Sequence, residues 1–200
     1  MKKKVLVCGS TGFIGRNVAE ALSQIEEYKV YGTHFTRPAL NNNNIHSIQA
    51  DLRVPHQVEA ALSGKDIVIQ AAATTSGAKD IVHNPYIHVT DNAVMNSLLL
   101  RTAFDNHITH FVFFSCTVMY QSSNNALSES DFDSSQELYS RYYGAGWTKV
   151  YIEKMCKFFS RLNRTKHTVI RHSNIYGPYD KYDLERSHVF GATIAKVMNA

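Results

Sequence analysis

The run Val5-Leu6-Val7-Cys8-Gly9-Ser10-Thr11-Gly12-Phe13-Ile14-Gly15 decides the fold of this 200-residue chain. Its four apolar residues predict a buried strand, and a Gly-x-x-Gly-x-x-Gly loop follows that strand directly. We expect Gly9 to permit a tight turn, Gly12 to let the backbone approach a pyrophosphate, and Gly15 to let a helix pack closely on the strand. Free N–H groups at the start of that helix attract negative charge. The run therefore predicts a dinucleotide-binding loop, which also includes Thr11, Phe13 and Ile14.

Beyond this loop, short apolar runs alternate with longer stretches whose apolar residues recur at helical spacing. The alternation predicts a parallel sheet covered by helices on both faces, a doubly wound α/β fold of the Rossmann type. Ligands bind such sheets at the carboxyl ends of the strands. The predicted strands are 5–8, 29–33, 45–49, 66–70, 110–115 and 168–171. The predicted helices are 14–25, 58–62, 89–106, 146–162 and a last one that begins near 189.

The composition is that of an ordinary globular protein, with 44% hydrophobic and 19% charged residues and a net charge of +4. The basic run Lys2-Lys3-Lys4 is better explained as the solvent-exposed start of a strand than as a nucleic-acid contact. Cys8, Cys116 and Cys156 form no C-x-x-C pair, which argues against a disulfide framework or a zinc site. No signal peptide is visible, and no apolar run approaches the ~18 residues of a membrane span. We therefore expect a cytoplasmic protein without a metal, a membrane contact or a nucleic-acid partner.

The end of the second predicted strand indicates which dinucleotide is bound. An acidic residue there takes the ribose hydroxyl of NAD. The segment Thr33-His34-Phe35-Thr36-Arg37 contains no carboxylate. Arg37, with Arg16 or His34, can instead hold a 2′-phosphate. The sequence favours NADP, and the alternative is NAD with Arg37 as a solvated loop residue.

The chain resembles the extended short-chain dehydrogenase/reductase family, which comprises nucleotide-sugar epimerases, dehydratases and reductases. The segment Thr11-Gly12-Phe13-Ile14-Gly15 matches the signature of that family. The resemblance implies that Asp51 of the pair Asp51-Leu52 contacts the adenine and that a loop after the fourth strand lies along the cofactor. The other matching positions are Ala71, Ala72 and Ala73 of that loop, Asn92, and the block Arg171-His172-Ser173-Asn174-Ile175-Tyr176-Gly177-Pro178, in which Asn174 is expected to bind substrate.

A more specific resemblance points to the GDP-L-fucose synthase branch of this family. In that branch a Ser-His-Val triplet follows Tyr-Gly-Pro at the spacing seen for 187–189. The resemblance implies that His188 is an acid in the epimerisation and that Arg186 binds substrate. A single histidine is otherwise more often structural. The domain boundaries that follow are a dinucleotide-binding domain over 1–178 and the start of a substrate-binding region over 179–200, with the small C-terminal substrate domain largely absent.

The proton-transfer machinery of the family departs from its usual pattern at a Tyr-x-x-x-Lys pair. The lysine of this pair lowers the pKa of the tyrosine and binds the nicotinamide ribose. The resemblance implies that Lys149 is this lysine, but the residue four positions earlier is Ala145. Tyr143 lies just upstream, and we expect the nearby glycines to keep the helix from reaching it. Tyr143 and His188 are the available replacement acids.

The second departure lies in the stretch Ser115-Cys116-Thr117-Val118-Met119-Tyr120. The family places a serine or threonine four residues before this tyrosine, where the chain has Cys116. We expect the hydroxyl of Thr117 or Ser115 to hold the sugar oxygen instead. Fucose synthases carry their epimerisation base two residues before the tyrosine, where this chain has Val118. Cys116 is then either a displaced base or an inert buried thiol.

Two functional hypotheses follow from these residues. The first is an NADP-dependent epimerase or reductase acting on a nucleotide sugar of the 4-keto-6-deoxy-hexose type. The second is a catalytically impaired protein of the same fold that binds NADP as a sensor or scaffold, and Ala145 favours it. The resemblance also implies a homodimer through the helices 89–106 and 146–162.

Overall fold

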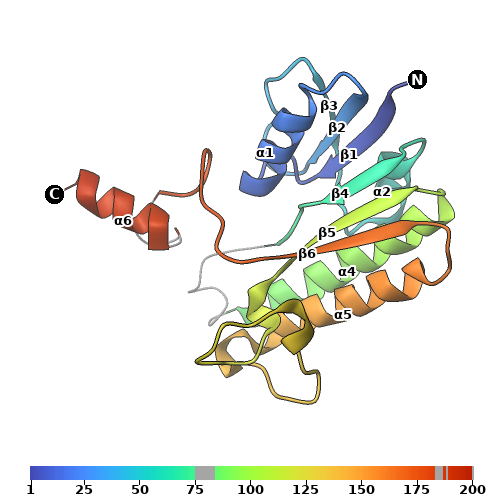
Figure 1. Ribbon diagram of the computed structural model, residues 1–200. Coiled ribbons are helices and arrows are strands. Elements are labelled where there is room, and N and C mark those ends of the chain that lie inside the picture. The colour runs from blue at the N-terminus through green and yellow to red at the C-terminus, as the bar shows by residue number, and fades with distance from the viewer. Residues whose placement is uncertain (75–83, 183–186, 188, 200) are drawn as a thin grey trace.

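The computed structural model describes residues 1–74, 84–182, 187 and 189–199. Six strands form one sheet in the order β3-β2-β1-β4-β5-β6, and all neighbouring strands are parallel (Figure 1). The chain order reverses at β1, which pairs with β2 on one side and β4 on the other. The strands are β1 Lys3–Cys8, β2 Tyr28–His34, β3 Ile45–Gln49, β4 Ile67–Gln70, β5 His110–Cys116 and β6 Lys166–His172.

Helices cover both faces of this sheet, with α1 on one side and α4 and α5 on the other (Figure 1). Alternate residues of β1 serve the two cores: Leu6 packs with the α2, α4 and α5 side, and Val7 packs with Ala19 of α1. Burial of both strand faces explains why the strands read as continuous apolar runs. The helices are α1 Phe13–Leu22, α2 Pro55–Leu62, α4 Pro85–Asp105, α5 Tyr143–Ser160 and α6 Val189–Met198, with 3₁₀ turns at Thr117–Met119, Glu129–Asp131 and Ser140–Tyr142.

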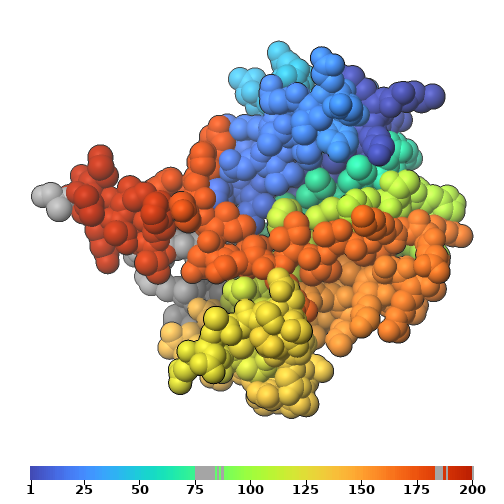
Figure 2. Space-filling view, in the orientation of Figure 1, coloured from blue at the N-terminus to red at the C-terminus, as the bar shows by residue number. Residues whose placement is uncertain are grey.

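The last helix, α6, stands apart from the body of the molecule (Figure 2). Its apolar side chains are largely exposed, as at Val189, Val197 and Met198. It lies at the carboxyl end of the sheet, which is the end that carries the glycine loop (Figure 1). None of the helices described by the structure combines the length and apolarity that crossing a membrane requires.

The predicted doubly wound parallel sheet is confirmed, with all six strands present near their predicted positions. The start of α5 was predicted wrongly, because the helix begins at Tyr143 rather than at Gly146. The low helix propensity of glycine is outweighed here by packing. A Cβ on Gly146 would lie 2.6 Å from Leu138 Cδ1 and 3.0 Å from the Val118 carbonyl oxygen, so this close contact favours glycine.

Candidate functional site

The glycine loop forms a tight turn between β1 and α1. Gly9 has a φ of +71°, and the Gly12 N–H donates to the Gly9 carbonyl at 2.9 Å. A Cβ on Gly15 would lie 2.2 Å from that same carbonyl oxygen, so only glycine allows this approach of helix to loop. Gly12 is the N-cap of α1, and no side chain caps the helix. The free N–H groups at the start of α1 therefore remain available to an anion.

The end of β2 anchors this loop from the side. The Gly9 N–H donates to Thr33 Oγ1 at 2.9 Å. Ser10 donates both its N–H and its hydroxyl to the Thr33 carbonyl, at 2.9 and 3.0 Å. Ser10 and Thr33 are both buried. These bonds hold the loop in one conformation before any ligand arrives, which lowers the entropy that binding must overcome.

Arg37 lies against the glycine loop, where its Nη1 donates to the Thr11 carbonyl at 3.0 Å. Among the described residues, no carboxylate forms an ion pair with its guanidinium. Arg16 is arranged differently, because it pairs with Glu20 at 2.8 Å and stacks on Tyr179. Of the two arginines considered from the sequence, Arg37 is thus the one whose charge is unpaired beside the loop.

The carboxylate of Asp51 is held by Arg53, a neighbouring residue to which the sequence analysis assigned no role. Arg53 donates to both Asp51 oxygens at 2.9 Å and to Asp91 at 2.8 Å. Hydrogen bonds from Arg53 lower the pKa of Asp51, so this carboxylate stays ionised. Leu52 is buried in the hydrophobic core, so its side chain contributes packing rather than a ligand contact.

Two amide side chains shape the loop that follows β4. Asn92 of α4 accepts from the Thr74 N–H at 3.1 Å and donates to the Thr74 carbonyl at 3.0 Å. Buried Gln70 makes the equivalent pair with the backbone of Ala72, at 3.2 and 3.1 Å. Asn92 therefore acts on the loop containing Ala71, Ala72 and Ala73 rather than pointing freely at a ligand. A Cβ added to Gly9 would lie 2.7 Å from Ala72 Cα, so the loops after β1 and β4 adjoin.

Lys149 is half-buried where α5 passes the end of β5. Its Nζ donates to the Phe114 carbonyl at 2.8 Å and lies 4.7 Å from the centre of the Phe113 ring. Burial lowers the pKa of Lys149, while the nearby Cys116 and Glu153 act in the opposite direction. Burial also raises the pKa of the Cys116 thiol, against the effect of the Lys149 charge. The structure thus brings Lys149 and Cys116 together at the carboxyl end of the sheet.

The two hydroxyls on either side of Cys116 differ in exposure. Ser115 is fully buried, and its hydroxyl donates to Met119 Sδ at 3.8 Å. Residues alternate between the faces of β5, and Ser115 faces the interior. That Ser115 holds a sugar oxygen stays a prediction. Thr117 is exposed in the 3₁₀ turn that follows β5. It remains the hydroxyl open to a ligand in this stretch.

The position expected to carry the catalytic tyrosine falls inside α5. Ala145 precedes Lys149 by four residues and shares its helix face. Tyr143 precedes Lys149 by six residues, a rotation of about 600° at 3.6 residues per turn, so it projects from another face. Its ring is half-exposed and packs edge-on against Trp147. Tyr143 is thus poorly placed to replace the missing tyrosine, and His188 and Arg186 lie outside the described residues.

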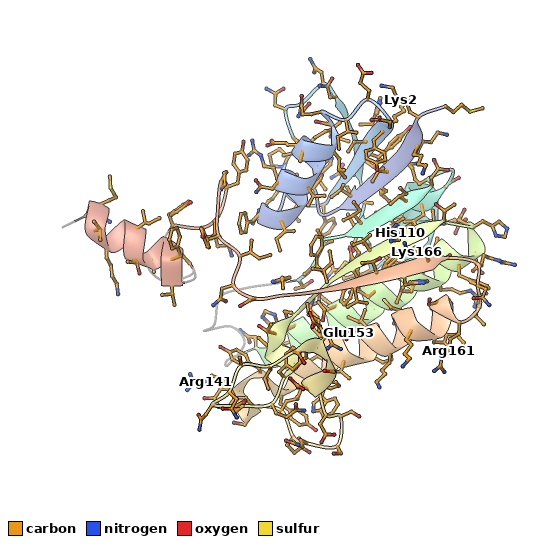
Figure 3. All side chains as sticks on the ribbon, viewed as in Figure 1. Lys2, His110, Arg141, Glu153, Arg161 and Lys166 are labelled. Carbon is orange, nitrogen blue, oxygen red and sulfur yellow. The ribbon has the colours of Figure 1, made fainter. Side chains whose placement is uncertain are left out.

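An ion pair that sequence reasoning did not assign to the site ties α5 to β6. Glu153, labelled in Figure 3, accepts from the Arg171 guanidinium at 2.8 to 3.2 Å. Arg171 also donates to the Tyr120 hydroxyl at 2.9 Å and to the Glu129 carbonyl at 2.8 Å. These bonds raise the pKa of Arg171. The cluster fixes the segment between β5 and α5 beside Lys149, while Asn174 lies exposed just beyond β6.

Residues 5–200 match the model of the NAD-dependent epimerase/dehydratase family. The chain belongs to this family. It is 26% identical over 200 residues to a GDP-L-colitose synthase of Yersinia pseudotuberculosis, covering 98% of this chain and 61% of that protein. It is 25% identical over 206 residues to a GDP-L-fucose synthase of Azorhizobium caulinodans, covering 99% and 60%. The chain thus spans about three-fifths of the length of these curated relatives.

Solved structures share the fold. A UDP-N-acetylglucosamine 4-epimerase from Methanobrevibacter ruminantium superposes with a TM-score of 0.83 at 26% identity, covering 100% of this chain and 64% of that one. A GDP-mannoheptose C4 reductase from Campylobacter jejuni with NADP bound superposes with a TM-score of 0.81 at 21% identity, covering 98% and 55%. The family resemblance read from the sequence is confirmed.

Proposed function

We propose that this family member is an NADP(H)-dependent epimerase or reductase acting on a nucleotide sugar of the 4-keto-6-deoxy-hexose type. The observation that carries the proposal is the glycine loop, with the unpaired Arg37 beside it and half-buried Lys149 at the same edge of the sheet. The GDP-L-colitose and GDP-L-fucose synthases among its relatives support the substrate class. The NADP in the Campylobacter reductase supports the cofactor.

The residues present fit a dinucleotide. The close approach of Gly15 to the Gly9 backbone brings the start of α1 to the glycine loop, where its free N–H groups would meet a pyrophosphate. Arg37, beside the same loop, would hold a 2′-phosphate. Lys149 would bind the nicotinamide ribose, and the hydroxyl of Thr117 would hold the sugar oxygen. When bound, the nicotinamide supplies or accepts the hydride. His188 would exchange a proton on the sugar ring, and Cys116 offers a protonated thiol beside Lys149.

Turnover is measured directly by the absorbance of NADPH during incubation with GDP-4-keto-6-deoxy sugars. We expect NADPH to be oxidised only when sugar is present, and substitution Lys149→Ala to slow the reaction by about 10²-fold or more, since acid–base groups contribute about 10² to 10⁴ in rate. Lys154→Ala, on an exposed position of the same helix, serves as the control. Absence of oxidation with every such sugar would contradict the reductase proposal.

Discrimination between NADPH and NADH tests the role of Arg37. Charge-assisted hydrogen bonds contribute about 1.5–3 kcal/mol, so Arg37→Ala should weaken NADPH binding by about 10- to 150-fold. NADH lacks the 2′-phosphate and should bind the variant as it binds the wild type. Fluorescence titration measures both dissociation constants. An equal loss for both dinucleotides would instead mean that Arg37 acts only by bracing the loop at Thr11.

A second candidate function is a cofactor-binding sensor or scaffold without turnover. It is favoured by two positions taken together, Ala145 on the Lys149 face of α5 and Cys116 at the end of β5. Neither side chain supplies the hydroxyl that the family places there. This candidate shares the dinucleotide site with the first, so NADPH binding supports both and turnover separates them.

We further propose a homodimer through the outer surface of α4 and α5. Large apolar side chains are exposed on these two packed helices, at Val94 of α4 and at Tyr151 and Phe158 of α5. Exposed apolar side chains gathered on adjoining elements are typical of protein–protein contacts. A two-fold axis through this face would pair it with the same face of a second copy.

A further inference from the structure

The segment that follows β6 reaches across the sheet to α1. We name residues 173–182 the strap. Asn17 of α1 donates its side-chain N–H to the Pro178 carbonyl at 2.9 Å. The guanidinium carbon of Arg16 lies 3.5 Å from the centre of the Tyr179 ring. In the sheet, β4 and β5 lie between β6 and β1, so the strap passes the carboxyl ends of both strands to reach α1 (Figure 1).

This path crosses the crevice where a dinucleotide-binding sheet holds its ligand. Chain order reverses between β1 and β4, and ligands bind outside the carboxyl ends at such a switch point. Asn17 also donates to the Phe13 carbonyl at 3.0 Å, so it lies one turn from the start of α1. The contacts of the strap with α1 are therefore adjacent to the N–H groups proposed to meet the pyrophosphate.

The backbone of the strap is held in an unfavourable conformation at its contact with α1. Tyr179 has a φ of +70°, in the left-handed region that residues other than glycine rarely adopt. Two bonds to the Gly177 carbonyl shape the turn around it, from the Asp180 N–H at 3.2 Å and the Tyr182 hydroxyl at 3.1 Å. Such conformations persist only where surrounding contacts hold them, and they gather at ligand clamps and switches. Arg16 and Asn17 provide those contacts.

The far end of the strap supports α6. The ring of Tyr176 lies 4.1 Å from that of Phe190, centre to centre. A Cβ on Gly191 would lie 2.7 Å from the Lys181 carbonyl oxygen, so α6 packs directly on the strap backbone. The strap thus contacts α1 near its start and also contacts α6. A change at the dinucleotide loop can reach α6 through these contacts.

We propose that the strap is a latch that retains the dinucleotide, with Asn17 and Tyr179 as its positioning residues. Contact with α1 closes the crevice over the bound cofactor, and the latch must open before the cofactor leaves. The proposal rests on the proposed dinucleotide site. It predicts that loss of either contact accelerates cofactor release without removing any group that binds the cofactor.

Stopped-flow fluorescence, with NADPH displaced by excess NADP, measures the dissociation rate. From the strength of a cation–π contact, Tyr179→Ala should raise this rate by about 2- to 30-fold. From the strength of one neutral hydrogen bond, Asn17→Ala should raise it by about 2- to 10-fold. Tyr179→Phe keeps the ring over Arg16 and should release NADPH at nearly the wild-type rate. Comparison of Tyr179→Ala with Tyr179→Phe therefore separates the loss of the ring contact with Arg16 from other effects of substituting Tyr179.

Trypsin cleavage after exposed Lys181 gives an independent measure of latch opening. NADPH should slow this cleavage in the wild type and in Tyr179→Phe, and should protect Tyr179→Ala much less. Alanine is the better helix former, so Asn17→Ala leaves α1 intact and carries the test alone if Tyr179→Ala fails to fold. Unchanged dissociation rates in both alanine variants would overturn the latch and leave dinucleotide binding standing. A wild type that does not bind NADPH would overturn both proposals.

Discussion

Substitution Ala145→Tyr should increase the rate of NADPH oxidation with a GDP-4-keto-6-deoxy sugar by about 10²- to 10⁴-fold, the range that a positioned acid–base group contributes. Position 145 precedes Lys149 by four residues in α5, so a tyrosine there would share the Lys149 face. The half-buried Lys149 ammonium would lower the pKa of the phenol and make it a better proton carrier near neutral pH. Steady-state absorbance under saturating NADPH measures the gain.

Ala145→Phe is the matched control, because it adds the same ring without the hydroxyl. Equal rates for the phenylalanine and tyrosine variants would mean that the phenol plays no part. A large gain from an inert wild type would identify a disabled active site and favour the sensor or scaffold function. Rapid turnover by the wild type would contradict that second candidate. The double variant Ala145→Tyr with Cys116→Ser tests whether the β5 position limits the rate further.

The fold could be predicted from local sequence because its signals are short and periodic. The run from Val5 to Gly15 combines a buried strand, a glycine loop and a helix start, and the structure places each at that position. The segment between β5 and α5 carried no such signal. The 3₁₀ turn at Glu129–Asp131 combines a local capping box of Ser128 and Asp131 with a long-range bond from Arg171 to the Glu129 carbonyl, and no local pattern reveals that long-range bond.

The start of α5 could not be predicted, because propensity and packing disagree there. Gly144 and Gly146 weaken a helix in isolation by about 1 kcal/mol each. In the folded chain, a Cβ on Gly144 would lie 2.8 Å from Val89 Cγ2 of α4. The same residues that argue against a helix by propensity therefore allow it to pack closely. Only knowledge of the neighbouring helix resolves this conflict.

The candidate site shows the same division between what the sequence indicated and what it left open. Lys149 was identified from its motif, and in the structure its Nζ donates to the Phe114 carbonyl. The different surroundings of Ser115 and Cys116 were missed, although strand alternation alone separates adjacent residues onto opposite faces. The hydrogen bonds between Asn92 and Thr74 could not be foreseen, because they join residues 18 positions apart through side-chain orientation.

Substitution Gly15→Ala should both destabilise the protein and weaken NADPH binding. The added Cβ would lie 2.2 Å from the Gly9 carbonyl oxygen and 2.8 Å from its carbon, both backbone atoms that no side-chain rotation can move away. Overpacking of this kind costs about 1–3 kcal/mol in unfolding free energy. Relief by moving α1 away from β1 would widen the loop, and the dissociation constant for NADPH should rise by about 5- to 150-fold if a similar free energy is lost from binding.

Gly64→Ala separates the two effects. Gly64 has a φ of +64°, and nothing lies within 4 Å of an added Cβ, so this variant loses about 1 kcal/mol through backbone strain alone. Urea unfolding and fluorescence titration measure both variants. Lower stability in both, with weaker NADPH binding in Gly15→Ala alone, would locate the cofactor at the glycine loop. Equal affinity of Gly15→Ala and Gly64→Ala for NADPH would contradict the prediction, because it would mean that the pyrophosphate site does not depend on the close contact between α1 and Gly9.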